Sequence, residues 1–260
     1  MFVDSHCHLD KIDLTPYQNS FSVFIEAAQQ QQLQHLLCIA IDLTAYPAMA
    51  ELVKSYSMIS LSVGVHPNVH LPANLEPTVQ QLIDFAQNPQ VVAIGETGLD
   101  YFRSKEDFDY QYQRFITHIT AAKAVNKPLI IHTRQANQDA LTILAEQGAD
   151  QVGGVIHCFT EDWAFAERAL ALNFDISFSG IVTFKNAKAI QQVAKQIPSD
   201  RFLIETDSPY LAPAPFRGKP NYPLYVRYVA EYLAELRQTT VHNIAAQSTA
   251  NFYRLFKLAI

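Results

Sequence analysis

The chain has 260 residues, of which 49% are hydrophobic and 17% are charged, and its formal net charge is −6. A chain of this length and composition can bury a large core. The acidic balance and the lack of a Lys/Arg run exclude a broad basic surface for duplex DNA or an anionic membrane. A nucleic acid held locally by metal ions remains compatible with this charge.

Eight short apolar runs recur along the chain, and segments with helical periodicity separate them. The predicted strands are residues 2–6, 35–41, 59–65, 91–95, 128–131, 154–157, 174–178 and 202–206. The predicted helices are residues 20–32, 45–55, 75–87, 106–125, 135–147, 161–172, 184–196 and 222–237. A ninth helix, at 241–256, is expected to pack Ile244, Phe252 and Phe256 against the outside of the sheet.

Strands that alternate with helices predict a parallel sheet, and eight such units in about 250 residues predict a closed (β/α)8 TIM barrel. An open doubly wound sheet is the nearest alternative, but no Gly-x-Gly-x-x-Gly turn follows the first strand. The chain has no linker, low-complexity tract or internal repeat. We therefore expect residues 1–260 to form a single α/β barrel domain with an extra C-terminal helix.

Side chains that can bind metals stand at the predicted strand ends, where TIM barrels hold their active sites. These residues are His6, His8, Glu96, His132, His157 and Asp207. Alternate side chains of a strand share a face, so Asp4, His6 and His8 are expected to point the same way. Imidazoles and carboxylates that converge on one mouth predict a centre for Zn²⁺, Mn²⁺ or Co²⁺, and less typically for Mg²⁺.

The motifs at these strand ends resemble those of the TatD family of metal-dependent hydrolases and deoxyribonucleases, within the amidohydrolase-like superfamily. The matching stretches are residues 4–10, 64–67, 95–101, 127–134, 157–159, 205–211 and 217–219. They follow the family's order over almost the whole chain. Two places differ from the family's pattern: Glu161-Asp162 replaces a common glycine, and Tyr222 replaces a glutamate. Both lie where a loop leads into a predicted helix, the sixth and the eighth, so they bear on substrate fit rather than on metal binding.

The resemblance implies two divalent metal ions per chain and a bridging carboxylate between them. In this assignment Glu96 is the bridge, His6, His8 and Asp207 hold the first ion, and His132 and His157 hold the second. Two cations within about 4 Å repel one another, so an anionic bridge between them is required.

Metals of this kind lower the pKa of bound water to about 7, which provides a hydroxide nucleophile. Asp207 is the expected general base, and it is expected to face the His6/His8 pair from across the barrel axis. Glu205 shares the face of Asp207 and is the second candidate catalytic residue. It either orients a ligand histidine or forms a buried ion pair.

Three residues at the expected mouth are candidates for substrate binding: His66, Arg134 and Arg217. An arginine guanidinium matches a phosphate with two hydrogen bonds, so Arg134 is the expected anion clamp. Arg217 and Lys219 follow the eighth strand and either reach a second phosphate or remain solvated. Phe159 and Trp163 either stack a base or pack the sixth helix.

The favoured function is a phosphodiesterase: a metal-dependent deoxyribonuclease that holds DNA, at single-stranded ends, locally at the metal site. The alternative is hydrolysis of a small ester, lactone or amide, although many such barrels carry a carbamylated lysine where Glu96 stands. The polymerase-and-histidinol-phosphatase family also opens with Asp-x-His-x-His, but it lacks the Gly-Glu-Thr-Gly-Leu-Asp of residues 95–100. A barrel without enzymatic activity is disfavoured because every expected ligand is present.

Cysteine content and the N-terminal sequence give the expected location. Cys7, Cys38 and Cys158 are odd in number and widely spaced, which is not the pattern of a disulfide framework. The chain starts directly in a predicted strand, without a secretory signal pattern, and has no apolar run of membrane-spanning length. We therefore expect a cytoplasmic protein with no membrane partner and no obligate protein partner.

Overall fold

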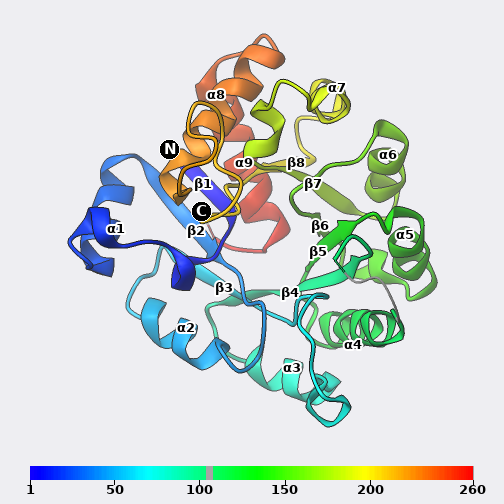
Figure 1. Ribbon diagram of the computed structural model, residues 1–260. Coiled ribbons are helices and arrows are strands. Elements are labelled where there is room, and N and C mark those ends of the chain that lie inside the picture. Colours follow the sequence, from blue (N-terminus) through cyan, green and yellow to red (C-terminus); the bar gives the residue numbers. More distant parts are fainter. Residues whose placement is uncertain (104–107, 260) are drawn as a thin grey trace.

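The computed structural model describes residues 1–103 and 108–259. Within them, eight parallel strands form one sheet in sequence order, and the edge strands approach each other through a bridge between Cys7 and Ser208. The result is a nearly closed TIM barrel, as predicted (Figure 1). The strands are β1 (Phe2–Cys7), β2 (Leu33–Cys38), β3 (Ile59–Val63), β4 (Val91–Asp100), β5 (Leu129–Arg134), β6 (Gly154–Ile156), β7 (Phe174–Phe178) and β8 (Phe202–Ile204).

Helices surround the barrel and cover the outer face of the strands (Figure 1). They are α1 (Phe21–Gln30), α2 (Tyr46–Val53), α3 (Val79–Phe85), α4 (Asp109–Val125), α5 (Asn137–Glu146), α6 (Trp163–Ala171), α7 (Lys188–Gln196), α8 (Val226–Leu236) and α9 (Val241–Leu255). Each lies within or close to a predicted helix. The predicted start of the fourth helix at 106 and 107 lies outside the described residues.

The lower interior of the barrel is apolar. Ile130, Val155 and Leu203 lie two positions before site residues of their own strands, so alternation turns them into the same interior. They form one buried cluster with Phe252 of α9 and with Phe256, which follows this helix. The expectation that these two phenylalanines pack on the outside was therefore wrong. Because α9 contributes to this interior cluster, it closes the N-terminal end of the barrel.

Strand β1 contains an irregularity that the alternation rule did not predict. Its register against β2 shifts by one residue between Asp4 and Cys7. Ser5 Oγ reaches Ser177 Oγ of the non-neighbouring β7, so Ser5 faces the interior, and the next residue, His6, faces it as well. Asp4 instead accepts hydrogen bonds from the backbone and hydroxyl of Thr206. The expectation that Asp4 shares a face with His6 was wrong.

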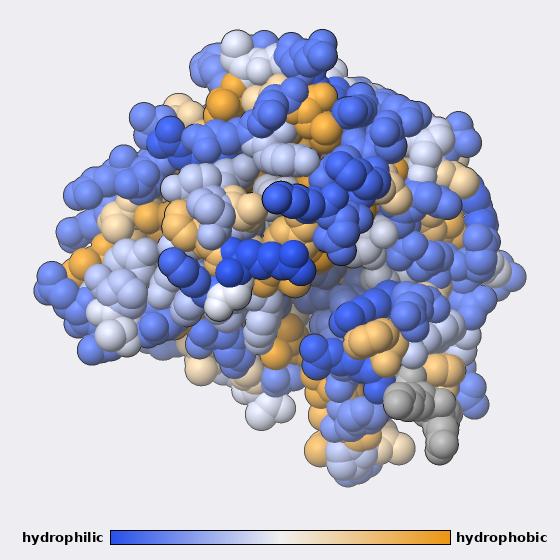
Figure 2. Space-filling model, turned by 45° about the horizontal axis from the view of Figure 1, so that its top comes forward, coloured by the Kyte–Doolittle hydropathy of each residue, from blue (hydrophilic) through white to orange (hydrophobic). Residues whose placement is uncertain are grey.

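None of the helices in the described part of the chain has the length and apolarity needed to cross a membrane. The face seen in Figure 2 is mainly hydrophilic, and its hydrophobic side chains lie in small separate groups.

Helix α4 fixes the loop that follows β3 through a buried histidine. His118 Nε2 accepts a hydrogen bond from the backbone N–H of Val65 at 2.9 Å, and His118 Nδ1 donates to the carbonyl of Arg114 at 2.7 Å. Burial lowers the pKa of His118 to about 4. The neutral ring is therefore part of the folded structure, because only its unprotonated nitrogen can accept the Val65 N–H.

This low pKa predicts a loss of stability in acid. Below about pH 6.5 the imidazole of residue 118 binds a proton in the unfolded chain, whereas in the folded chain it stays neutral until about pH 4. The free energy of unfolding therefore falls as the pH is lowered over that range. At pH 4.5 this one site should remove about 2–3 kcal/mol relative to pH 7. His118→Gln keeps an acceptor but does not titrate. Urea unfolding of metal-free protein should show a shallower pH dependence for the variant, and parallel curves would contradict the assignment.

Candidate metal centre

The first group of predicted ligands lies between β1, β4 and the end of β8. His6 Nε2 is 3.4 Å from Glu96 Oε2 and 3.7 Å from Asp207 Oδ1, and His8 Nε2 is 3.4 Å from Asp207 Oδ1. Ligand atoms around a tetrahedral ion with bonds of about 2.1 Å are separated by about 3.4 Å. These three separations therefore match the spacing of ligands around a metal ion.

The second group surrounds the other oxygen of the same carboxylate. Glu96 Oε1 lies 3.0 Å from His132 Nδ1, 2.8 Å from His157 Nε2 and 3.3 Å from His66 Nε2. His132 Nδ1 and His157 Nε2 are themselves 3.5 Å apart. Among the described residues, three groups have potential ligand atoms within 4.8 Å of one another: His6, His8 and Glu96; His66, Glu96 and His132; and His6, His157 and Glu205.

In three of the predicted ligand histidines, the ring nitrogen that faces away from the centre, called the remote nitrogen, lies next to a hydrogen-bond acceptor. The acceptors are the carbonyl of Ile39 for His8 Nδ1, Asp100 Oδ2 for His132 Nε2, and Glu205 Oε1 for His157 Nδ1, at 3.2, 3.2 and 3.3 Å. Each remote nitrogen donates its proton there, so the nitrogen facing the centre is unprotonated in the neutral ring. Such a nitrogen beside a carboxylate oxygen is favourable only with a cation or a proton between them.

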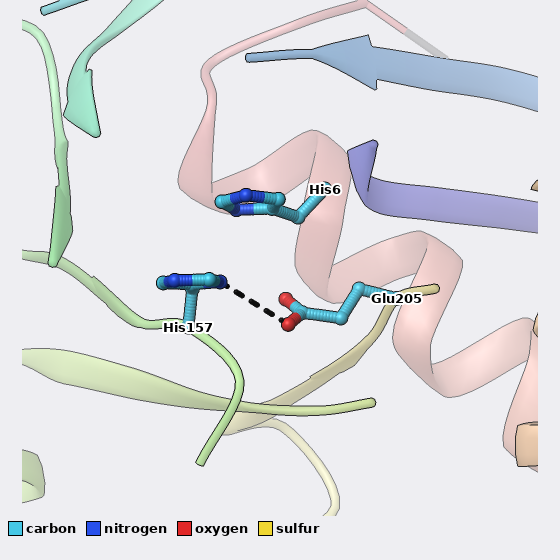
Figure 3. Close-up of side chains that lie close together, drawn as sticks. All are labelled: His6, His157 and Glu205. Carbon is cyan, nitrogen blue, oxygen red and sulfur yellow. Dashed lines mark hydrogen bonds and ion pairs between the residues drawn. The ribbon is translucent and has the colours of Figure 1, made fainter. Parts of the chain in front are cut away.

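His6 supplies an independent indication of a cation site. Neither of its imidazole nitrogens, both buried, makes a hydrogen bond among the described residues. Its ring stacks on that of His157, with centroids 3.9 Å apart, and Glu205 lies beside the pair (Figure 3). Buried polar atoms normally have partners, so the nitrogen that faces Glu96 and Asp207 fits a metal ligand.

The charges of the centre are strongly coupled. Burial opposes ionisation of Glu96, yet His157, His66 and His132 around it hold its pKa well below the usual range. Burial likewise opposes a charge on His157, but Glu96 and Glu205 raise its pKa well above the usual range. The centre therefore keeps an ionised carboxylate surrounded by rings that attract protons or metal cations.

Asp207 occupies a position beside the histidines of β1. Its backbone N–H donates to the carbonyl of His6 at 2.9 Å, and the adjacent Ser208 bridges to Cys7. The expectation that it faces His6 and His8 from across the barrel axis was therefore wrong. Strand β8 is the neighbour of β1, so one carboxylate reaches both imidazoles directly.

Glu205 lies beneath the centre, where its Oε1 accepts hydrogen bonds from the His157 ring and from the backbone N–H of Cys158. Its Oε2 is buried without a hydrogen-bond partner in the described chain. The contact with His157 is the one that both expected roles of Glu205 require, orienting that histidine or forming a buried ion pair with it. The thiol of Cys7 donates to the carbonyl of Leu37, and that of Cys158 contacts the hydroxyl of Ser179.

Sequence reasoning gave no role to Asp100 and Asn68. Asp100 accepts the His132 ring proton and also a hydrogen bond from the Asn68 side chain at 2.7 Å. Asp100 lies four positions after Glu96 in one strand, and this spacing could have identified it. Asn68 lies in a loop whose course the sequence pattern does not determine.

The other predicted substrate residues lie on loops or strand ends at the mouth. The guanidinium of Arg134 lies over the ring of Phe102, 3.8 Å from its centroid, and that of Arg217 lies over Phe184 at 4.4 Å.

Phe159 is buried against Phe165 and Phe178, so it cannot stack a base and instead packs in the core. Trp163 is partly buried against the same core, and Lys219 is exposed.

Residues 3–257 match the protein family described as TatD related DNase. The chain is 45% identical over 256 residues to the uncharacterized metal-dependent hydrolase YcfH of Escherichia coli K12, which covers 98% of this chain and 96% of the relative. It is 42% identical over 258 residues to YabD of Bacillus subtilis, covering 99% and 100%. Among solved structures, YjjV, a TatD homologue from E. coli, has a TM-score of 0.90 at 27% identity, covering 99% and 98%.

Replacing Glu96 tests the metal centre directly. Its two oxygens face different groups of histidines, so Glu96→Ala should lower the metal content of the purified protein, measured by elemental analysis. The exposed Asp84→Ala on α3 is a control that removes a carboxylate far from the centre. Both variants should keep the circular dichroism spectrum of the wild type. Wild-type metal content in Glu96→Ala would show that this carboxylate is not a ligand.

Proposed function

Since the chain belongs to the TatD-related DNase family of metal-dependent hydrolases, we propose that it hydrolyses phosphodiester bonds of DNA at single-stranded ends, with two divalent cations in its centre. The observation that carries this proposal is that the two oxygens of Glu96 face different histidines. Its Oε2 faces His6, whereas its Oε1 faces His132 and His157. A carboxylate with this arrangement can bridge two cations about 4 Å apart, a spacing used to clamp a phosphoryl group.

The residues fit such a centre with the remote hydrogen bonds of His8, His132 and His157 unchanged. His6, His8 and Asp207 would hold one cation, His132 and His157 the other, with Glu96 shared. Cations in these positions would acidify a bound water and neutralise charge on the phosphoryl oxygens. The donor set of imidazole and carboxylate supports Zn²⁺, Mn²⁺ or Co²⁺ more strongly than Mg²⁺.

Asp207 is suited to accept the proton of the attacking water. Burial opposes its ionisation, but His8 and His6 lower its pKa below the usual value. It is therefore a carboxylate at neutral pH. Glu205 acts on the reaction through His157, since its Oε1 holds the imidazole and the backbone that follows it.

The rim of the mouth supports a nucleic-acid substrate over a small ester. Phe102 follows β4 and Tyr210 follows β8, which lie on opposite sides of an eight-stranded barrel, and they are 49% and 54% exposed. Exposed aromatic rings on both sides of a centre are suited to stack unpaired bases. Arg134 lies on the Phe102 ring, so a phosphate and its base could be held by neighbouring side chains.

The proposal is tested with metal-free protein to which Mn²⁺, Zn²⁺ or Mg²⁺ is added separately. Each sample is assayed on single-stranded and duplex oligonucleotides and on small esters, lactones and amides. Metal-dependent cleavage of single strands, above that of duplexes and small substrates, is expected. Turnover confined to the small substrates would overturn the proposal in favour of an esterase or amidase.

Removing the predicted clamp should affect charged substrates selectively. Arg134→Ala should lower phosphodiester turnover by roughly 10–1000-fold, because a charge-assisted contact contributes about 1.5–4 kcal/mol. Turnover of a neutral ester should change little. Arg227→Ala on α8 removes an exposed arginine paired with Glu231 and is the matched control. An equal loss on both substrates would instead indicate a structural role for Arg134.

Asp207→Asn tests the general base. The amide keeps one oxygen for a cation but cannot accept the proton, so kcat should fall by at least the roughly 10²–10⁴-fold typical of a positioned base. KM should change much less than kcat. Metal content is measured in the same preparation, because loss of the cation would imitate loss of the base. Near-normal kcat in fully loaded variant would remove Asp207 from this role.

A further inference from the structure

His66 differs from the three ligand histidines in the direction of its remote hydrogen bond. Its Nδ1 accepts the backbone N–H of Asn68 at 3.0 Å. A backbone amide can only donate, so Nδ1 carries no proton and the neutral ring is protonated at Nε2. Nε2 is the atom that faces the centre, 3.3 Å from Glu96 Oε1.

We propose that His66 is not a metal ligand and instead donates its Nε2–H to a phosphoryl oxygen of the substrate. A nitrogen that binds a metal must have a free lone pair, which Nε2 of this tautomer lacks. The remote nitrogens of His8, His132 and His157 face acceptors, which leaves their inner lone pairs free. The remote hydrogen bonds of those three rings leave the inner nitrogens free to bind a metal. The remote hydrogen bond of His66 has the opposite direction and leaves a proton on its inner nitrogen, which makes this ring a donor.

The backbone around His66 is held so that this tautomer is maintained. The His66 N–H donates to the carbonyl of Ile41 at 2.9 Å, and its carbonyl accepts from Arg114 Nη1 at 2.8 Å. The Asn68 side chain donates to Asp100, which keeps the Asn68 backbone beneath the ring. Turning the imidazole over would leave the Asn68 N–H facing a carbon atom, so the flipped ring loses a buried hydrogen bond.

The donor atom is also accessible to a substrate. The His66 side chain is 18% exposed, compared with 1% for His6 and 4% for His157. Its ring meets that of His132 at 4.5 Å and 62°, so it stands at the wall of the centre nearest β3. A phosphoryl oxygen arriving from the mouth can replace Glu96 Oε1 as the acceptor of the Nε2–H. A neutral donor aimed at developing phosphoryl charge stabilises a transition state without transferring its proton.

Identification of the acceptor as a phosphoryl oxygen rests on the proposed function, whereas the tautomer does not. Long-range ¹H–¹⁵N spectra of the imidazoles in Zn²⁺-loaded protein measure the tautomer, with the His66 signals assigned by their loss in His66→Gln. The expected spectrum shows His66 protonated at Nε2, unprotonated at Nδ1 and without a zinc-induced shift. An Nδ1–H tautomer, or zinc bound at Nε2, would overturn the inference.

Variants then test the donor role. His66→Ala should keep the full metal content by elemental analysis, unlike Glu96→Ala, and should lower kcat for a phosphodiester by roughly 10–1000-fold. His66→Gln, which carries an amide N–H donor, should recover part of that loss. Loss of metal in His66→Ala, or unchanged kcat, would each overturn the donor role. If the wild type cleaves no phosphodiester, the proposed function fails, while the spectra still decide whether His66 is a ligand.

Discussion

The buried carboxylate of Glu96 is the constraint on which the centre depends. An ionised carboxylate away from water costs several kcal/mol unless opposite charge and hydrogen bonds compensate for it. The compensation comes from imidazoles of β1 and β5, of the residue that follows β6 and of the loop after β3, within 2.8–3.4 Å of its two oxygens. Only a closed barrel brings these segments, far apart in sequence, to one mouth. The arrangement that stabilises the buried carboxylate also places imidazole and carboxylate donors together, which is the donor set that many divalent cations prefer.

Hydrogen-bond polarity then divides the histidines into different roles. All of them approach carboxylate oxygens, so distance alone cannot separate a ligand from a donor. The deciding contacts lie on the far side of each ring: Ile39, Asp100 and Glu205 provide acceptors, whereas Asn68 provides a donor. Residues in the loops and at the strand ends, which contact the far side of each ring, therefore determine the chemistry of the side chains that reach the centre.

The fold and the convergence of the candidate ligands could be predicted because both depend on short-range patterns. Apolar runs mark the strands, and parallel strands bring their ends, with His132, His157 and Glu96, to one edge. The position of Asp4 could not be predicted, because the one-residue register shift in β1 changes which side chains face the interior. The sequence has no pattern that marks such a shift. Asp207 was misplaced because strand order around a closed barrel makes β8 the neighbour of β1. The contact of Asn68 depends on loop geometry, which residue spacing does not encode, whereas Asp100 stands four positions after Glu96 in the same strand.

The positions that depart from the family's pattern lie outside the metal centre and the apolar layer beneath it. Asp162 caps α6 by accepting the Phe165 N–H, and Glu161 is hydrogen-bonded to Asn137. Tyr222 is buried against Tyr17 and Tyr225. These side chains are held by local structure, so they shape the rim without touching the ligand set. Beneath that rim, the apolar layer closed by α9 keeps the strand ends in register. Changes in the loops can therefore alter what enters the mouth while the spacing of the histidines stays the same.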